Sequence, residues 1–452
     1  MIKGEFNLKF RYEIDGIGEV PISQNEKYGA QTQRAISLYS TSDNITMGRY
    51  KNFVCSILQI KEASAAVNRK IGAIELNVAI NIENVCRDLT VNYKDEMYPI
   101  HPFHSGGGIT ANMIINETVA NIVNYQFYEK KLGTYSPCHP NDHINLNHST
   151  SDCLLSASHM AVEKELNILV DALSATKEQF LCLSIQHGDE KKISRTCLQD
   201  AVPIAFSEFY FGYIGTIDKY INRFVFLIKE LKKLNLGGNI IGRKGDCAAE
   251  YTENIYIELS QITGVTYQKH DNFFQCSQSH DTLQATGSEL ELLAHGLVKI
   301  GKDLRLMSSG PYTGLSEIFL PAVQAGSSAM PGKVNPTIPE FLVQTSMQAI
   351  GHCASVRLGH VHGELDYNPW IMIVVTNLID AIHQLSSGLN VTWMHCLYGI
   401  EPNTERNNKN ITSLIPIIIE LKAKVGYSKA SEIAKKCEFD VDKIKQVIAK
   451  IL

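Results

Sequence analysis

Apolar residues recur at helical spacing over unusually long segments of this chain. Within 152–183, the positions i, i+3, i+4 and i+7 are occupied by Leu166, Leu169, Val170 and Leu173. This spacing places all four on one face of an α-helix. The same spacing predicts helices over 204–234 and 284–308, and composition predicts two more over 337–360 and 370–396. Each segment is longer than the average globular helix of about 11–12 residues. Such helices bury their apolar faces against one another, so the pattern predicts a helical bundle.

Strand signals are scarce by comparison. Residues 1–50 are typical of an irregular arm with short strand-like pieces, and helical signals begin near Tyr50. No alternating runs separated by hairpin turns occur in the middle of the chain. The sequence therefore predicts an all-α fold.

Two polar, turn-rich stretches suggest where domains meet. One is HPNDHINLNHSTSD (139–152) and the other is EPNTERNNKN (401–410). A chain of 452 residues is also long enough for two or three domains. We expect an N-terminal helical domain over 1–141, a central long-helix bundle over 142–396 and a small C-terminal helical domain over 397–452.

Composition excludes several classes of partner. The formal net charge is −5 and no strongly basic stretch stands out, so neither nucleic acid nor a membrane surface is an expected partner. The longest apolar runs, such as WIMIVV (370–375), are too short to span a bilayer. The N-terminus lacks the apolar region of a signal peptide, and the eleven cysteines include no C-x-x-C. These features predict reduced thiols and a cytoplasmic location.

The segment Gly326–Pro336, GSSAMPGKVNP, carries the strongest chemical signal. It combines mobile glycine and serine residues, a lysine, an amide and then Pro336, which is favoured in the first turn of a helix. Free backbone N–H groups at a helix start attract anions, and Lys333 adds a full positive charge. The segment suits a loop that closes on a carboxylate. The ordinary alternative is a surface loop before a helix.

This segment resembles the GSSxMPxKxNP signature loop of the aspartase/fumarase superfamily. Class II fumarases, aspartate ammonia-lyases and argininosuccinate lyases belong to it, and residues 302–336 look closest to aspartate ammonia-lyase. Three more regions resemble the family in the same order, namely EKYGAQTQRA (26–35), HPNDHINLNHSTSD (139–152) and RTCLQDAVP (195–203). ITANMIINETVAN (109–121) is a further match. The resemblance implies three helical domains and a homotetramer whose sites are shared between subunits.

The resemblance also implies roles for particular residues. Ser327 corresponds to the base that removes a proton next to a carboxylate, and Lys333 and Asn335 bind that carboxylate. The other expected substrate-binding residues come from second and third subunits: Gly107, Gly108, Ser149, Thr150, Ser151, Thr196 and Cys197. The expected ligand is a small dicarboxylate, and the family needs no cofactor and no catalytic metal.

Some of these residues have an ordinary alternative role. Ser149, Thr150 and Ser151 precede a helix, where hydroxyl side chains commonly act as N-caps. His139 and Asn141 match a family region that binds a second carboxylate, but a plain loop role suits them equally well.

Four departures from the family pattern bear on specificity. Cys197 stands where fumarases have a histidine that positions water, and Ile109 replaces a threonine whose hydroxyl binds a carboxylate. Ser151 replaces an asparagine near the leaving group, and Arg243 with Lys244 adds two cations to a glycine-rich loop. These changes indicate either neutral drift or a changed substrate.

We therefore expect a lyase that forms fumarate, or a fumarate-like product, by β-elimination from a succinate-type acid. C–N cleavage as in aspartate ammonia-lyase is the first interpretation, possibly on an N-substituted or otherwise modified aspartate. Fumarate hydratase is the alternative. A non-catalytic scaffold or binding protein with the same fold is the hypothesis from another class.

Overall fold

The structure is a computed structural model that describes residues 9–40 and 44–451. Its long helices are α5 (Thr150–Gln186), α6 (Phe206–Leu231), α9 (Asp281–Met307), α10 (Thr337–Val361) and α11 (Ile371–His395). All five lie within a few residues of the predicted segments, so the mostly helical fold is confirmed. No helix in the described part of the chain is long and apolar enough to cross a membrane. All eleven cysteines are free thiols.

The chain divides into two compact units. The first comprises residues up to Ile168 together with Phe224–Glu291 and Ala349–His383. The second comprises Leu169–Arg223, Leu292–Gln348 and the residues from Gln384 onward. The division falls within each of the five long helices. The expected three-domain division stays a prediction.

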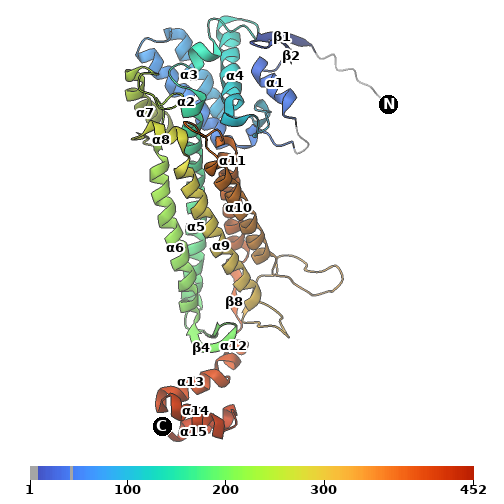
Figure 1. Ribbon diagram of the computed structural model, residues 1–452. Coiled ribbons are helices and arrows are strands. Elements are labelled where there is room, and N and C mark those ends of the chain that lie inside the picture. The colour runs from blue at the N-terminus through green and yellow to red at the C-terminus, as the bar shows by residue number, and fades with distance from the viewer. Residues whose placement is uncertain (1–8, 41–43, 452) are drawn as a thin grey trace, which may run out of the picture. The chain divides into compact units, whose positions relative to one another are not determined.

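The first unit is built around helices that are buried on nearly all sides. Its further helices are α1 (Ala30–Leu38), α2 (Lys51–Lys70), α3 (Leu76–Val91), α4 (Ile109–Tyr128), α7 (Ala249–Thr263) and α8 (Phe273–Gln278). Figure 1 shows α2, α3 and α4 side by side, and α2 packs against both α3 and α7. Fifteen consecutive residues of α4, from Thr110 to Asn124, are buried. Polar side chains on α4 therefore need partners within the protein.

Short helices and strands complete this unit. The single-turn helices are η1 (Met47–Arg49), η2 (Asp95–Met97), η3 (Gly106–Gly108) and the π-helical η4 (Pro140–Ile144). The strands β1 (Phe10–Asp15) and β2 (Gly18–Ser23) form an antiparallel hairpin, while β5 (Lys233–Leu234) and β6 (Gln268–Lys269) form a short parallel pair.

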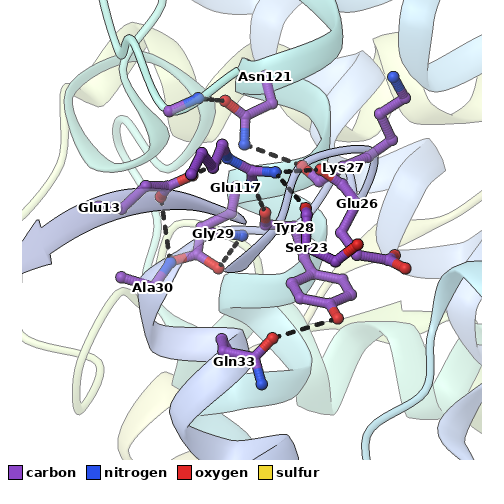
Figure 2. A network of polar contacts seen from close by, with 12 residues as sticks. Glu13, Ser23, Glu26, Lys27, Tyr28, Gly29, Ala30, Gln33, Glu117 and Asn121 are labelled. Atoms are coloured by element: carbon purple, nitrogen blue, oxygen red, sulfur yellow. Dashed lines mark hydrogen bonds and ion pairs between the residues drawn. The ribbon is translucent and has the colours of Figure 1, made fainter. Parts of the chain in front are cut away.

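The N-terminal arm is more regular than expected, because α1 follows the β1–β2 hairpin and lies before Tyr50. The start of α1 has no side-chain cap of its own, and Glu117 from α4 caps it instead. The carboxylate of Glu117 accepts hydrogen bonds from the backbone N–H groups of Gly29, Gln31 and Thr32 at 2.9, 3.0 and 3.2 Å. It also accepts the Thr32 hydroxyl at 2.6 Å. Figure 2 shows Glu117 beside Gly29 and Ala30 at the start of this helix.

A second carboxylate completes the cap. Glu13 Oε2 accepts the Ala30 N–H at 3.2 Å, and Glu13 Oε1 accepts Arg11 Nε at 2.8 Å. The Asn121 side chain, one turn beyond Glu117, donates to the Lys27 carbonyl (Figure 2). The motif EKYGAQTQRA is thus explained as a helix start whose free N–H groups are satisfied from outside the helix.

The second unit contains a β-hairpin that the sequence did not predict. Strands β3 (Lys191–Thr196) and β4 (Gln199–Ala205) pair antiparallel with a register shift between Ile193 and Arg195. The two turn residues, Cys197 and Leu198, have φ of 54° and 61°. Such turns favour asparagine and glycine, so these residue types gave no hairpin signal.

The remaining elements of this unit lie towards the C-terminus. The strands β7 (Ile318–Phe319) and β8 (Glu401–Pro402) pair antiparallel, and η5 (Leu397–Gly399) precedes β8. The terminal helices are α12 (Thr404–Ile411), α13 (Leu414–Val425), α14 (Tyr427–Lys436) and α15 (Val441–Ile451). A small apolar core that includes Leu421, Ala434 and Ile444 holds α13, α14 and α15 together (Figure 1).

Candidate active site

The signature loop lies between α9 and α10 in the second unit. The hydroxyl oxygen of Ser327 accepts hydrogen bonds from the backbone N–H groups of Ala329 at 3.2 Å and Met330 at 3.0 Å. Two N–H donors aimed at this oxygen favour its negatively charged form. The Ser327 oxygen is thus held by two backbone donors of its own loop.

The base of the loop is closed by the residues that follow Ser327. Asn335 Nδ2 donates to the Gly326 carbonyl at 2.6 Å, and the Gly326 N–H donates to the Lys333 carbonyl at 3.0 Å. The side chain of Lys333 is exposed, and no acceptor within the described residues contacts its ammonium. Helix α10 begins at Thr337, directly after Pro336 as predicted. Part of the Asn335 amide is thus used within the loop, while the Lys333 charge remains available to an anion.

The hydroxyl cluster Ser149–Ser151 lies at the start of α5 in the first unit. Ser149 Oγ accepts the Ser151 N–H at 3.1 Å and donates to the Asn239 carbonyl at 3.0 Å. Ser149 therefore has the predicted capping role. Thr150 Oγ1 accepts from Asn112 Nδ2 at 3.0 Å. Burial raises the pKa of Tyr367, and the neighbouring Ser151 side chain opposes that rise.

Asp152 fastens a glycine-rich loop to this helix start. Its carboxylate is buried and accepts the backbone N–H groups of Ser149, Gly237 and Asn239 at 2.8, 3.1 and 2.9 Å. Burial raises the pKa of Asp152 to about 7, against these hydrogen bonds and the attraction of Lys61, which lower it. The Asp152 carboxylate thus joins residues 149–152 to the loop at 237–239.

Gly107 and Gly108 pack closely against this cluster. A Cβ on Gly108 would clash with Leu154 Cδ1, and one on Gly107 would lie 3.5 Å from the Tyr367 hydroxyl. The φ angle is 77° at Gly107 and 70° at Gly108. The Gly107 N–H donates to the Pro369 carbonyl at 2.5 Å and the Gly108 N–H to the Ser105 carbonyl at 3.4 Å. Both N–H groups therefore have partners within the protein. The lack of a side chain on these two glycines lets the backbone lie close to Leu154 and Tyr367.

Thr196 and Cys197 lie at the exposed tip of the β3–β4 hairpin in the second unit. Arg195 anchors this hairpin through an ion pair with Glu317, whose buried carboxylate lies 2.6 Å from Arg195 Nη1. Lys192 Nζ lies 3.3 Å from the other oxygen of Glu317. Burial lowers the pKa of Lys192, against the attraction of Glu317. A buried carboxylate held by two cations fixes the base of the hairpin and leaves its tip free.

The remaining predicted residues have local partners. His139 Nδ1 accepts the backbone N–H groups of Asn141 and Asp142 at 3.3 and 3.2 Å, so it caps η4. Arg243 forms an ion pair with Asp246 at 2.5 Å within its own loop. A cavity of about 890 Å³ lies along this loop and is also lined by Lys244.

A buried polar network behind Thr150 was not predicted from the sequence. Lys61 on α2 is fully buried, and its ammonium contacts Asn112, Asn145 and His148. These partners are 51, 84 and 87 residues away in the chain. A lone lysine within an apolar helix gives no sign of such contacts. The only available signal was the match of 109–121 to a family region.

In the first unit, the structure brings together Gly107, Gly108 and residues 149–151. The second unit contains both the hairpin tip and the signature loop, on different elements.

Comparisons with known proteins identify the family. Residues 18–351 match the family described as Lyase. The chain is 34% identical to a class II fumarate hydratase of Prochlorococcus marinus, covering 96% of this chain and 92% of that protein. It is also 34% identical to an aspartate ammonia-lyase of Helicobacter pylori, covering 94% and 90%.

Two solved structures have the same fold. One is a fumarate lyase:delta crystallin from Brucella melitensis bound to cobalt, with a TM-score of 0.93 and 32% identity over 98% of this chain and 96% of that one. The other is a class II fumarase from Schistosoma mansoni, with a TM-score of 0.93 and 25% identity over 98% and 96%. The chain belongs to the lyase family of the aspartase/fumarase superfamily.

Proposed function

We propose that this protein is a lyase that forms fumarate by β-elimination from a succinate-type dicarboxylate. The observation that carries the proposal is the geometry of Ser327, whose oxygen accepts two backbone N–H groups in the same loop that carries the exposed cation of Lys333. Family membership supplies the reaction class. Ser149, Thr150, Ser151 and Thr196 supply hydroxyl groups that can donate hydrogen bonds to carboxylate oxygens.

The reaction follows from these groups. The Ser327 alkoxide takes the proton from the carbon next to one carboxylate, and the electron pair of that C–H bond moves into the carboxylate. The resulting dianion is stabilised by Lys333, because the charge on the carboxylate oxygens grows in this step. The electron pair then returns to form the carbon–carbon double bond, and the bond to the leaving group breaks. The leaving group carries off that bond's electrons: an ammonium group departs as neutral ammonia, and a hydroxide takes a proton from solvent water.

Water is the leaving group that the relatives favour. Most of the similar proteins compared are fumarate hydratases, including those of Prochlorococcus marinus and Bacillus subtilis. The comparisons therefore support the fumarate hydratase alternative better than the C–N cleavage that the sequence motifs indicated first.

Ammonia or an amine is the second candidate because of Cys197. This exposed residue lies at the hairpin tip, where the resemblance places the water-positioning histidine of fumarases. A thiol cannot hold water as an imidazole does, since it is only a weak donor and acceptor. The aspartate ammonia-lyase of Helicobacter pylori is as similar to this chain as the first fumarate hydratase, at 34% identity.

A panel of substrates separates these candidates. The purified protein would be given malate, aspartate and N-substituted aspartates, and fumarate would be followed by its ultraviolet absorbance. The highest kcat/KM identifies the leaving group, and Ser327→Ala serves as the inactive control. Absence of fumarate from every substrate, with a correctly folded protein, would refute the lyase proposal and favour the scaffold hypothesis.

We further propose that the active site is shared between subunits of a homotetramer. The hairpin tip carries apolar side chains on its surface, with Leu198 72% and Val202 42% exposed. Burial of these side chains against a second subunit would remove apolar surface from water and bring Thr196 to a signature loop. Sedimentation or light scattering of the purified protein would test the predicted tetramer, and a stable monomer would contradict it.

A further inference from the structure

The buried network behind Thr150 has a defined direction for every hydrogen bond. Lys61 Nζ lies 2.7 Å from Asn112 Oδ1, 2.9 Å from Asn145 Oδ1 and 2.8 Å from His148 Nε2. Asn112 Nδ2 lies 3.0 Å from Thr150 Oγ1. The chemistry of the contacting atoms decides which group donates and which accepts in each pair.

Two backbone carbonyls settle the first assignments, because a carbonyl oxygen can only accept. Asn145 lies 3.1 Å from the His148 carbonyl, so its amide nitrogen faces that carbonyl and its oxygen faces Lys61. His148 Nδ1 lies 3.0 Å from the Leu146 carbonyl, so Nδ1 carries the proton. His148 Nε2 then has a lone pair and accepts from Lys61. Burial, and then the charge of Lys61, lowers the pKa of His148 well below its usual range, which agrees with a neutral ring.

The charge state of Lys61 follows from these assignments. Its three neighbours all present acceptor atoms, and an ammonium has three protons to donate. A neutral amine would turn its lone pair towards one of these acceptors. Burial lowers the pKa of Lys61, but the three hydrogen bonds require the protonated form.

The last assignment concerns Asn112. Its oxygen must face Lys61, which only donates, so its amide nitrogen must face Thr150. The same nitrogen also donates to Asn145 Oδ1 at 3.0 Å, so its two protons serve Thr150 and Asn145. The Thr150 oxygen therefore accepts from Asn112, and its own proton is left to point elsewhere. No acceptor among residues 9–40 and 44–451 is recorded for that proton.

We propose that Lys61, acting through the amide of Asn112, is a positioning residue that holds the Thr150 hydroxyl as a hydrogen-bond donor to a substrate carboxylate. The proposal rests on the role of Thr150 in the proposed function. A threonine hydroxyl can either donate or accept towards a ligand, whereas a carboxylate only accepts. Fixing the donor direction before the substrate arrives avoids the cost of reorienting the hydroxyl on binding. Lys61 and Asn112 do not need to touch the substrate for this effect.

The variant Asn112→Asp tests the direction of the relay. An aspartate has the same shape and still accepts from Lys61, but its second oxygen accepts the Thr150 proton and withdraws it from the ligand. That oxygen also faces Asn145 Oδ1, an acceptor that loses a donor, and the control must reproduce this second effect. We expect the inhibition constant of succinate and the KM of the preferred substrate to rise about 10- to 100-fold, the typical effect of losing a hydrogen bond to a charged group. We expect kcat to change by less than about threefold, because the contact is made in the ground state.

Asn116→Asp is the matched control. Asn116 lies one turn further along α4, and its Nδ2 donates to Asn145 Oδ1 at 3.3 Å. The control substitution thus removes a donor to the same asparagine without touching Thr150. We expect succinate inhibition to stay within about threefold of the parent protein. A loss equal to that of Asn112→Asp would assign the effect to packing and overturn the relay.

A double substitution distinguishes failure of the relay from failure of the site. If Asn112 acts through the Thr150 hydroxyl, Asn112→Asp should have almost no further effect in a Thr150→Val protein. Additive losses would mean that the introduced carboxylate acts directly on the substrate, and the relay would be wrong. An unchanged succinate constant in Thr150→Val alone would remove Thr150 from the site. Lys61→Met should reproduce the loss seen with Asn112→Asp if the protein folds.

Discussion

Replacing Glu117 by glutamine should release the start of α1 without disturbing the rest of the chain. Glu117 is buried, and one of its oxygens accepts Gly29 N–H, Thr32 N–H and the Thr32 hydroxyl. The other oxygen accepts the Gln31 N–H at 3.0 Å. The oxygen of a glutamine at position 117 can keep the hydrogen bonds to Gly29 and Thr32. Its NH2 group then faces the Gln31 N–H, and because both groups are donors no hydrogen bond forms there.

The magnitude can be built from these four contacts. A hydrogen bond to a charged group contributes about 1.5–3 kcal/mol, and a neutral hydrogen bond contributes about 0.5–1.5 kcal/mol. Each of the three hydrogen bonds that the glutamine oxygen keeps is therefore weaker by roughly 1 kcal/mol. The lost bond to Gln31 costs about 1 kcal/mol, at the low end because Gln31 is exposed to water. Relief from burying a charge offsets part of this sum. We expect the free energy of local opening at residues 29–32 to fall by about 2–4 kcal/mol.

Amide hydrogen exchange measures that opening directly. The expected change is a roughly 30- to 1,000-fold faster exchange of the Gln31 and Thr32 amides, since about 1.4 kcal/mol corresponds to a factor of ten. Glu83→Gln is the control, because Glu83 forms an ion pair with the partly exposed Arg69. Such pairs contribute about 0–1 kcal/mol. Exchange of these two amides within about threefold of the parent in Glu117→Gln would show that the carboxylate does not hold α1.

The other predictions concern the proposed site. Ser327→Ala should lower kcat by at least about 1,000-fold with an unchanged circular dichroism spectrum, because the base is lost; near-normal turnover would exclude Ser327 from that role. Lys333→Met should raise KM and lower kcat together, since the cation stabilises charge that grows in the transition state, and a change in KM alone would limit the lysine to substrate binding. Mixing Ser327→Ala subunits with Thr196→Val subunits should restore part of the activity, and no recovery after verified mixing would contradict shared sites. Asp152→Asn should lower the melting temperature and weaken succinate inhibition, and unchanged values would show that the loop at 237–239 is held by other contacts.

The long helices could be predicted from the sequence because their signal is local. The spacing of Leu166, Leu169 and Leu173 is enough to define one face of α5. Helix α1 and the β3–β4 hairpin gave no comparable signal, since α1 is short and is capped by Glu117 from another helix. The hairpin turns at Cys197 and Leu198, which are unusual residues for positive φ.

The candidate site was predictable to the extent that it lies in continuous motifs. Ser327 and Lys333 stand in one segment, as do Ser149 and Thr150, so a resemblance in sequence was enough to propose them as site residues. The network of Lys61 depends on a fold that brings distant segments together, and no local pattern encodes it. Which group donates and which accepts each hydrogen bond depends on how the groups are arranged in space, so it can be assigned only from the structure.

The attachment of Asp152 to the glycine-rich loop has a consequence for how this protein can evolve. Asp152 holds the loop through the backbone N–H groups of Gly237 and Asn239. Every residue except proline has such a group, so the anchor tolerates almost any side chain beyond it. Arg243 and Lys244 can therefore be exchanged without moving the loop away from Ser149. A mutational scan should find Arg243 and Lys244 tolerant and Gly242 intolerant, because a Cβ on Gly242 would lie 2.6 Å from backbone atoms of Phe273 and Phe274. Arg243 and Lys244 are therefore positions where new specificity can arise at little cost in stability.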